Sequence, residues 1–247
     1  MAEFTPMDPR FRVELIAATP NPQQCVYAGM HQDYSEGFVA SDRAEWPDEQ
    51  TAGAICVKRL LAGERGHYGP LEHAQIVLNV GWFPHSVMQQ ARTHRVGVSF
   101  DVQSMRYTGE RISRAAKGEI DLEEVFYLRP VGAYSDRQGK KYNYDATQRA
   151  IDLEICRAAA ARYRDLLDAG YAEEHARGIL PFDYRQHFVV SFTLRAFLHF
   201  LDLRAKLDAQ QEIRELCDLM WPHLQAWVPE FAEWYEKSRL HKARLAP

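Results

Sequence analysis

Residues 90–107 gather guanidinium, imidazole, hydroxyl and amide side chains into one short stretch, QARTHRVGVSFDVQSMRY. Arginine forks match the oxygens of phosphate and carboxylate groups, and an imidazole orients a ligand or passes a proton near neutral pH. The same composition also fits a solvated helix end, where basic residues favour the negative end of the helix dipole. Taken alone, the stretch indicates either the handling of a small anion or an ordinary helix C-terminus.

Charge is distributed unevenly along the chain. The formal net charge is −4, which argues against an extended nucleic-acid groove, because basic residues should dominate one face of such a groove. Between Arg92 and Lys117, however, there are six Lys or Arg residues and only two acids, Asp101 and Glu110. This local excess favours a small anionic ligand over a polymer.

Length and composition indicate an ordinary globular protein. The chain has 247 residues, 46% of them apolar, which suits one large domain or two closely packed ones. No apolar run approaches the roughly 20 residues needed to cross a bilayer, and the N-terminus lacks the pattern of a secretion signal, so we expect a cytoplasmic protein. Four widely separated cysteines without metal-ligand spacing are expected to be reduced, mostly in the core: Cys25, Cys56, Cys156 and Cys217.

The position of the basic stretch depends on the helices and strands that precede it. Apolar periodicity and turn residues predict a strand at 12–16, a short helix after Pro22, a helix at 48–63 and a strand at 74–80 that Gly81 and Pro84 stop. A further helix is expected after Pro84. On it, Gln90 and His94 would share a face, and Gly97 would be the C-cap.

The remaining elements indicate an α+β protein, because strands are followed mainly by helices. We expect strands at 100–108 and 124–128 joined by a long charged loop at 109–121, a linker at 132–143, a long helix before Gly170, and a short helix at 173–180. Residues 187–193 fit either a strand or a buried helix. Helices are expected at 195–203 and from 208 onward, where Pro222 separates two apolar stripes.

Three blocks of sequence, in order, resemble the flavin-dependent thymidylate synthases. The family signature is Arg-His-Arg, then seven or eight residues, then Ser; here Thr93, His94 and Arg95 precede Ser104 by eight residues, and Arg92 is the spare arginine. The block Gly66–His73 resembles the family's Gly-His-x-x-x-x-Glu-His segment. Downstream, Arg177–Pro181 and Arg195–Arg204 resemble its Ala-Arg-x-x-Leu-Pro and closing Asn-Leu-Arg segments. The resemblance covers about residues 60–215.

The resemblance implies a fold and a reaction. The fold is a mixed central sheet flanked by helices, as one domain over residues 1–247, in a homotetramer whose active sites lie at subunit interfaces. The reaction is the reductive methylation of dUMP to dTMP, with 5,10-methylenetetrahydrofolate as carbon donor and NADPH as reductant through FAD, releasing tetrahydrofolate. Other thymidylate synthases add a cysteine thiolate to the uracil ring, but none of the four cysteines here has the setting of an activated nucleophile.

The resemblance also assigns residues to the nucleotide. Arg204 would polarise the uracil ring electrostatically and is the candidate catalytic residue. Its alternative role is that of a cation at a helix C-terminus. No base neighbours Ser104 in the sequence, so this serine is assigned to binding rather than to nucleophilic attack. The residues assigned to dUMP are Gln90, Arg92, Thr93, Gln103, Ser104, Met105, Arg106, Arg177 and Arg204.

A second set of residues is assigned to the flavin in the same way. In the family, asparagine often stands where this chain has Thr193 and His199, and glutamate where it has Asp101. These replacements keep hydrogen-bonding ability. A structural role for His67 is equally open. The residues assigned to FAD are Ser35, His67, Glu72, Thr93, His94, Arg95, Asp101, Thr193, Arg195 and His199.

Two other classes of function fit parts of the sequence. A metal-dependent hydrolase could use the histidines between His67 and His94 with Glu72, although no pair has the His-x-x-x-His spacing that sets two ligands on one helical face. We therefore predict no metal site. A non-catalytic nucleotide or RNA binder could use the basic stretch; it would be colourless, and its binding would weaken steeply with salt.

Overall fold

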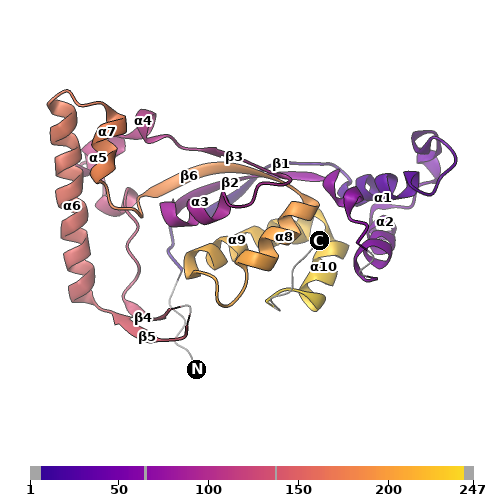
Figure 1. Ribbon diagram of the computed structural model, residues 1–247. Coiled ribbons are helices and arrows are strands. Elements are labelled where there is room, and N and C mark those ends of the chain that lie inside the picture. Colours follow the sequence, from indigo (N-terminus) through magenta and orange to yellow (C-terminus); the bar gives the residue numbers. More distant parts are fainter. Residues whose placement is uncertain (1–6, 64–65, 137, 242–247) are drawn as a thin grey trace. The chain divides into compact units, whose positions relative to one another are not determined.

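The computed structural model describes residues 7–63, 66–136 and 138–241 (Figure 1). The chain divides into two compact units. The first comprises Met1–Arg12, Val80–Arg92 and Asp101–Phe188, and the second comprises Val13–Asn79, Thr93–Phe100 and Val189–Pro247. The expectation of one domain over residues 1–247 stays a prediction.

Four strands form a sheet in the order β1-β2-β6-β3. They are β1 (Arg12–Ala18), β2 (Gln75–Pro84), β3 (Val98–Val102) and β6 (Arg185–Thr193). In β6, Phe188, Val190 and Phe192 are buried while the residues between them are half-buried. This alternation has the period of a strand and resolves the ambiguity of residues 187–193.

Strand β2 runs further than the sequence predicts. The prediction that Gly81 stops it is wrong, since the strand continues to Pro84. A Cβ added at Gly81 would lie 3.1 Å from Nδ1 of His187, so glycine here allows a close approach rather than a turn. Pro84 ends the strand, and α3 (His85–Ala91) follows it as expected.

The first two helices of the second unit pack against each other. Helix α1 (Pro22–Gln32) begins at the predicted proline, and the carboxylate of Glu49 accepts hydrogen bonds from the free backbone N–H groups of Gln23 and Gln24, at 2.7 and 2.9 Å. Glu49 is the first residue of α2 (Glu49–Cys56), which continues as a π-helical turn to Leu61. The predicted helix at 48–63 is thus confirmed, and α1 and α2 lie side by side (Figure 1).

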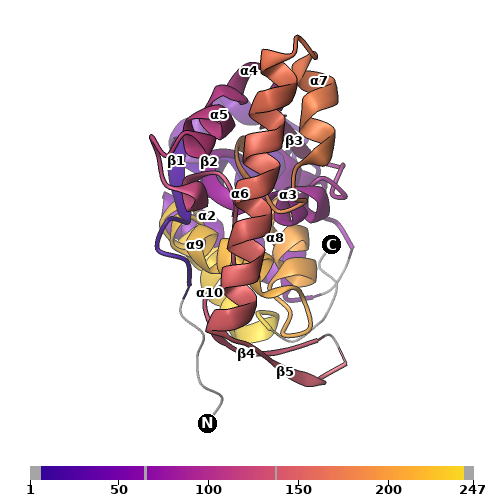
Figure 2. The same ribbon diagram turned by 90° about the vertical axis from the view of Figure 1, so that its left-hand side faces the viewer.

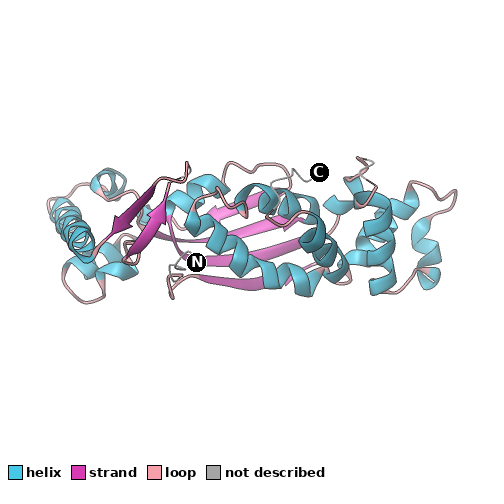
Figure 3. Ribbon diagram, turned by 90° about the horizontal axis from the view of Figure 1, so that it is seen from below, coloured by secondary structure: helices cyan, strands magenta, loops and turns pink. Residues whose placement is uncertain are grey.

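Three further helices of this unit are α8 (Leu194–Arg204), α9 (Gln211–Trp227) and α10 (Pro229–Ser238). Helix α10 packs against both α9 and α2. The ring of Phe192 in β6 stacks on Phe197 of α8 at 5.1 Å and meets Phe200 edge-on at 5.3 Å. Helix α8 follows β6 directly in the chain, and Figure 3 shows the strands together with the helices that lie over them. Aromatic packing therefore fixes α8 to the strand that precedes it.

The predicted break at Pro222 is wrong, since this proline lies inside α9. The helix ends at Trp227, where Val228 leaves the helical conformation with φ −135° and ψ 68° and Pro229 starts α10. One buried stripe, Ile213, Leu216, Met220 and Leu224, continues past the proline. Burial of that stripe outweighs the single backbone hydrogen bond that a proline removes.

In the first unit, the long helix predicted before Gly170 is confirmed as α6 (Ala146–Asp168). Asp145 caps it by accepting a 2.9 Å hydrogen bond from the backbone N–H of Gln148. The short helix predicted at 173–180 is α7 (Glu173–Ala176) with a 3-10 turn to Ile179. Helix α6 contacts both α5 (Glu110–Ala116) and α7, and all three lie close together in Figures 1 and 2.

Between β3 and α6 the structure differs from the sequence predictions. The strand expected at 100–108 ends at Val102, and α4 (Met105–Thr108) follows; α5 lies within the expected loop 109–121. Residues 122–124 form a 3-10 turn, and at 124–128 only Phe126 makes a β-bridge, to Tyr184. The expected linker 132–143 contains a hairpin, β4 (Gly132–Ser135) and β5 (Lys141–Tyr144).

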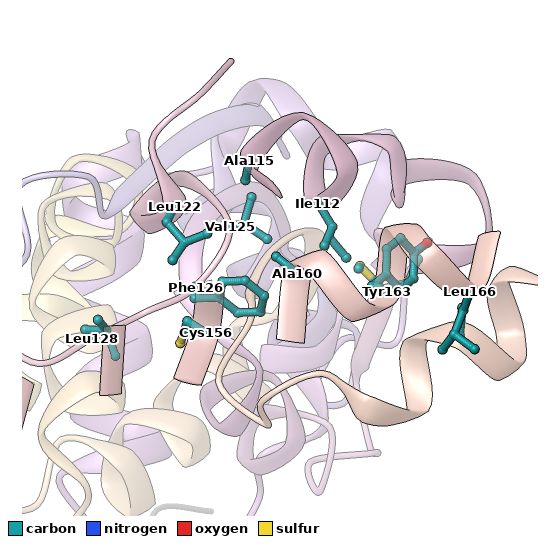
Figure 4. Packing of buried hydrophobic residues seen from close by; sticks show 12 residues of the cluster. Ile112, Ala115, Leu122, Val125, Phe126, Leu128, Cys156, Ala160, Tyr163 and Leu166 are labelled. Carbon is teal, nitrogen blue, oxygen red and sulfur yellow. The ribbon is translucent and has the colours of Figure 1, made fainter. Parts of the chain in front are cut away.

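The core of the first unit explains these differences. Ile112 and Ala115 of α5 pack with Phe126 and with Ala160 and Tyr163 of α6 (Figure 4). A Cβ at Gly109 would lie 2.0 Å from the hydroxyl oxygen of Tyr163, so only glycine lets α5 start this close to α6. Glu110 and Arg114 lie on the exposed face of α5, whereas Arg111 is half-buried and donates to the backbone carbonyl of Arg185.

The four cysteines are free. Cys56, Cys156 and Cys217 are buried, as predicted, and Cys25 is half-buried. Burial raises the pKa of the Cys156 thiol to about 11 and that of Cys56 to about 12, so both are protonated near neutral pH. A protonated thiol is a poor nucleophile.

Candidate active site

The guanidinium of Arg204, the last residue of α8, contacts the basic stretch directly. Its Nε donates a 3.0 Å hydrogen bond to Nε2 of His94, and its Nη2 donates a 2.7 Å hydrogen bond to Oγ1 of Thr93. The predicted helix face shared by Gln90 and His94 is wrong, because α3 ends at Ala91. His94 instead lies in the turn before β3, and this turn brings it to Arg204.

His94 is a neutral hydrogen-bond acceptor. A guanidinium only donates, so Nε2 of His94 accepts and the ring proton lies on Nδ1. Burial, followed by the charges of Arg204 and His199, lowers the pKa of His94 to about 4. The His94 ring lies 5.6 Å from that of His199 and 4.9 Å from that of Phe200. The imidazole therefore stays uncharged near neutral pH.

The turn that carries Thr93 and His94 is attached to the start of α8. Gly97, with φ of 68°, accepts a 2.8 Å hydrogen bond from the backbone N–H of Thr193. A Cβ at Gly97 would lie 2.5 Å from Oγ1 of Thr193, so the turn requires glycine both for its conformation and for space. Gly97 is thus not the predicted cap of α3. Thr193 caps α8, since its hydroxyl accepts a 3.2 Å hydrogen bond from Ala196 N–H.

Four further residues assigned to the flavin lie in the second unit in polar contacts. Arg195 forms a 2.6 Å ion pair with Glu72, both partly exposed. Nε2 of His67 lies 2.7 Å from a carboxylate oxygen of Asp33, an acid that the sequence prediction missed because 34 residues separate the two. Ser35 hydrogen-bonds within its own turn, with Gly37.

Candidate nucleotide ligands of the first unit lie on short helices. Ser104 caps α4 through a 3.4 Å hydrogen bond from the backbone N–H of Arg106. The guanidinium of Arg106 is exposed and forms a 3.1 Å ion pair with Glu174 of α7. Arg177 is exposed just beyond α7, and its charge counteracts the rise in the pKa of Tyr184 that burial causes. The sequence prediction missed Glu174, which lies far from Arg106 in the sequence.

The structure thus groups the predicted residues only in part. Thr93, His94, Thr193, His199 and Arg204 lie together in the second unit, and Arg195 pairs with Glu72. Ser104 and Arg106 are neighbours in the first unit. Met105 is buried, with 2% of its surface exposed, so only its backbone suits a ligand contact. The other assigned residues are exposed or half-buried: Gln90, Arg92, Arg95, Asp101 and Gln103.

The described residues hold neither a metal-binding cluster nor a membrane-spanning helix. In the part of the chain that the structure describes, no group of three or more His, Cys, Asp or Glu side chains could hold a metal ion. A metal-dependent hydrolase therefore has no candidate centre among those residues. No helix within 7–63, 66–136 and 138–241 combines the length and the hydropathy of a membrane span.

Known proteins resemble this chain along most of its length. A family described as "Thymidylate synthase complementing protein" matches residues 14–230. The flavin-dependent thymidylate synthase of Halobacterium salinarum is 34% identical over 96% of this chain and 100% of its own length. The enzyme of the same name from Haloarcula marismortui is 32% identical over 95% and 99%.

Solved structures share the fold. The UMP/dUMP methylase PolB of Streptomyces cacaoi, bound with 5-Br UMP, has a TM-score of 0.71 at 20% identity over 96% of both chains. Thymidylate Synthase X of Helicobacter pylori, with FAD and dUMP, has a TM-score of 0.69 at 17% identity over 94% of this chain and 99% of its own. The predicted α+β class with a helix-flanked sheet and the prediction of an enzyme are confirmed. This chain belongs to the family of flavin-dependent thymidylate synthases.

Proposed function

We propose that this protein converts dUMP to dTMP, with 5,10-methylenetetrahydrofolate as carbon donor and NADPH as reductant, and releases tetrahydrofolate. The observation that carries the proposal is the setting of Arg204. Its partly buried guanidinium donates to two uncharged acceptors, Thr93 and His94, neither of which places a negative charge beside it. Such a cation stabilises negative charge that develops on a uracil ring.

The phosphate and sugar of dUMP suit the polar residues of the first unit. Ser104, Arg106 and Arg177 supply a hydroxyl and two exposed arginine forks, which match phosphate oxygens. Gln90, Arg92, Thr93, Gln103 and the backbone of Met105 complete the proposed set. In a homotetramer with active sites at subunit interfaces, these groups would serve either their own protomer or a neighbour.

The donor set of the second unit fits FAD. Arg95 is exposed and suits a pyrophosphate, and Arg195 and His199 lie four residues apart on α8 and therefore share a face. Glu72 holds Arg195 through its 2.6 Å ion pair. The remaining proposed contacts are Ser35, His67, Thr93, His94, Asp101 and Thr193. When bound, the flavin supplies the hydride chemistry that none of the side chains can perform.

Self-association is supported by an apolar stripe on the outer face of α6. Ile151 and Ile155 are 50% and 57% exposed. They lie with Ala146, Thr147, Ala150, Glu154 and Ala158 around a hollow of about 790 Å³. We propose that this stripe contributes to the homotetramer. An Ile151→Glu change should lower the molar mass found by light scattering. Gln148→Glu, which adds the same charge to the same helix, should not.

The expected cytoplasmic location stays a prediction.

An anaerobic assay tests the proposed function. Purified protein should be yellow, should release FAD on denaturation, and should form dTMP from dUMP only when NADPH and methylenetetrahydrofolate are both present. Omission of either co-substrate is the control. Colourless protein that FAD cannot reconstitute, or flavin-loaded protein that forms no dTMP, would contradict the proposal.

A further inference from the structure

Two adjacent residues, Thr93 and His94, hold one guanidinium at two different nitrogens. Oγ1 of Thr93 lies 2.7 Å from Nη2 of Arg204, and Nε2 of His94 lies 3.0 Å from Nε. Two hydrogen bonds from different edges of a planar group fix both its position and its rotation. A single bond would leave the guanidinium free to turn about that bond.

Both acceptors hold the guanidinium without neutralising it. A carboxylate at either position would hold Arg204 more strongly but would cancel its charge, whereas a hydroxyl and a neutral imidazole leave the charge for a ligand. His94 is 8% exposed and packs against Phe200. Protonation of His94 would remove the acceptor at Nε2 and place a second positive charge beside Arg204.

The turn that carries Thr93 and His94 is bonded to both ends of α8. Thr193 caps the start of α8 and donates its backbone N–H to Gly97, in the turn that follows His94. Arg204 is the last residue of α8 and contacts Thr93 and His94. The helix start therefore holds the turn, and the turn holds the helix end. Movement of Arg204 requires one of these contacts to break.

We propose that Thr93 and His94 are positioning residues which clamp the guanidinium of Arg204 in the orientation used on an anionic pyrimidine. The assignment of the pyrimidine rests on the proposed function; the clamp itself does not. Thr93 stands where the family signature has arginine. An arginine there would place a second cation next to Arg204 and could not accept its hydrogen bond, so threonine suits the clamp.

The clamp is tested first in the ligand-free protein, through the Nε–H signal of Arg204 in a ¹⁵N–¹H spectrum. Arg204→Lys identifies the signal by removing it. In the wild type the signal should be protected from exchange with solvent. His94→Leu should increase its exchange rate about tenfold or more, whereas His94→Gln, which keeps an acceptor, should retain most of the protection. An unchanged Nε–H signal in a folded His94→Leu variant would overturn the proposal.

Steady-state kinetics of the flavin-loaded enzyme test the consequence. Thr93 is exposed, so Thr93→Val should fold normally. It should lower kcat about tenfold, a larger factor than any rise in KM for dUMP, while Thr93→Ser should restore kcat. Thr93→Arg should be at least as impaired as Thr93→Val. Equal kcat for wild type, Thr93→Val and Thr93→Arg would show that the orientation of Arg204 by Thr93 does not matter for catalysis, and would overturn this part of the proposal. If the wild type forms no dTMP, the proposed function fails, and the exchange measurement alone decides whether the clamp exists.

Discussion

Two arginines, one in each unit, differ in how their charge is used. Arg185 of the first unit is fully buried. It pairs with Asp8 at 2.6 Å, donates to the backbone carbonyl of Trp82 at 2.8 Å, and lies 5.4 Å from the ring centre of Tyr127. Arg204 of the second unit is partly exposed and donates to two neutral groups. A buried carboxylate marks Arg185 as structural, whereas Thr93 and His94 add no negative charge beside Arg204, as its proposed role requires.

Arg106 is intermediate between these two. It is exposed and pairs with an exposed carboxylate, Glu174, at 3.1 Å. Exposed pairs contribute little to stability, so the contact does not anchor the fold. It does reduce the charge that Arg106 offers to an incoming phosphate. The partner of an arginine is therefore more informative about its role than the arginine itself.

The largest expected effect concerns the structural arginine. Asp8→Ala leaves the charge of Arg185 buried without its carboxylate, which should lower the free energy of unfolding by about 3–5 kcal/mol. Asp121→Ala is the control: this exposed acid pairs with Arg10 at 2.9 Å, and its loss should cost at most about 1 kcal/mol. Denaturant unfolding measures both. Equal losses of unfolding free energy in the two variants would show that the backbone carbonyls and aromatic rings around Arg185 stabilise its charge without Asp8.

The next effect concerns the arginine assigned to the ligand. Arg204→Ala should lower the rate of dTMP formation by about 10²–10³, the scale of one lost transition-state donor. Flavin content and the free energy of unfolding should change little, because Arg204 is half-buried and its hydrogen bonds to Thr93 and His94 are made to neutral groups. Arg157→Ala, an exposed arginine on α6, is the control. Full activity of Arg204→Ala would mean that its role is misassigned.

The sequence was sufficient to predict the helices and strands with clear apolar periodicity, such as α6 and α8. It failed where tertiary packing decided the structure. Residues 109–121 carry many charges and read as a loop, yet Ile112 and Ala115 on one face are enough to bury α5 against α6. Gly81 and Pro222 read as breaks, but close strand packing and a buried stripe override them.

The candidate site was predictable as a set of residues but not as an arrangement. Resemblance to a family identified Thr93, His94 and Arg204. It did not predict that Arg204 contacts the other two, which lie 111 and 110 residues before it in the sequence. Partners outside the family blocks, Asp33 of His67 and Glu174 of Arg106, were missed. Such pairs depend on how distant segments fold together, and a single sequence carries no local signal for them.

A smaller effect would sharpen the intermediate case of Arg106. Glu174→Gln removes the carboxylate that competes with phosphate for this guanidinium, so the affinity for dUMP should increase about two- to fivefold, the range expected for an exposed pair. The gain should shrink at high salt because screening weakens the original pair. Titration calorimetry measures the dissociation constant, and Glu173→Gln on the same helix is the control. Weaker dUMP binding in Glu174→Gln would mean that Glu174 helps to bind the nucleotide.

The smallest effect separates two titrating groups of the second unit by the sign of their pH dependence. Burial raises the pKa of Asp202 to about 6, although a 2.7 Å hydrogen bond from Tyr235 and the charges of Arg239 and Lys206 act to lower it. The folded protein then binds more protons at Asp202 than the unfolded chain between about pH 4 and 6, so this group makes stability fall as pH rises through that range. His94, whose pKa is lowered to about 4, has the opposite effect: it makes stability fall as pH drops below about 6.5.

Asp202→Asn should therefore gain stability relative to the wild type as pH rises from 4 to 6. His94→Gln should gain stability relative to the wild type as pH falls through the same range. Parallel curves for the two variants in unfolding measurements would show that neither group titrates as its burial requires.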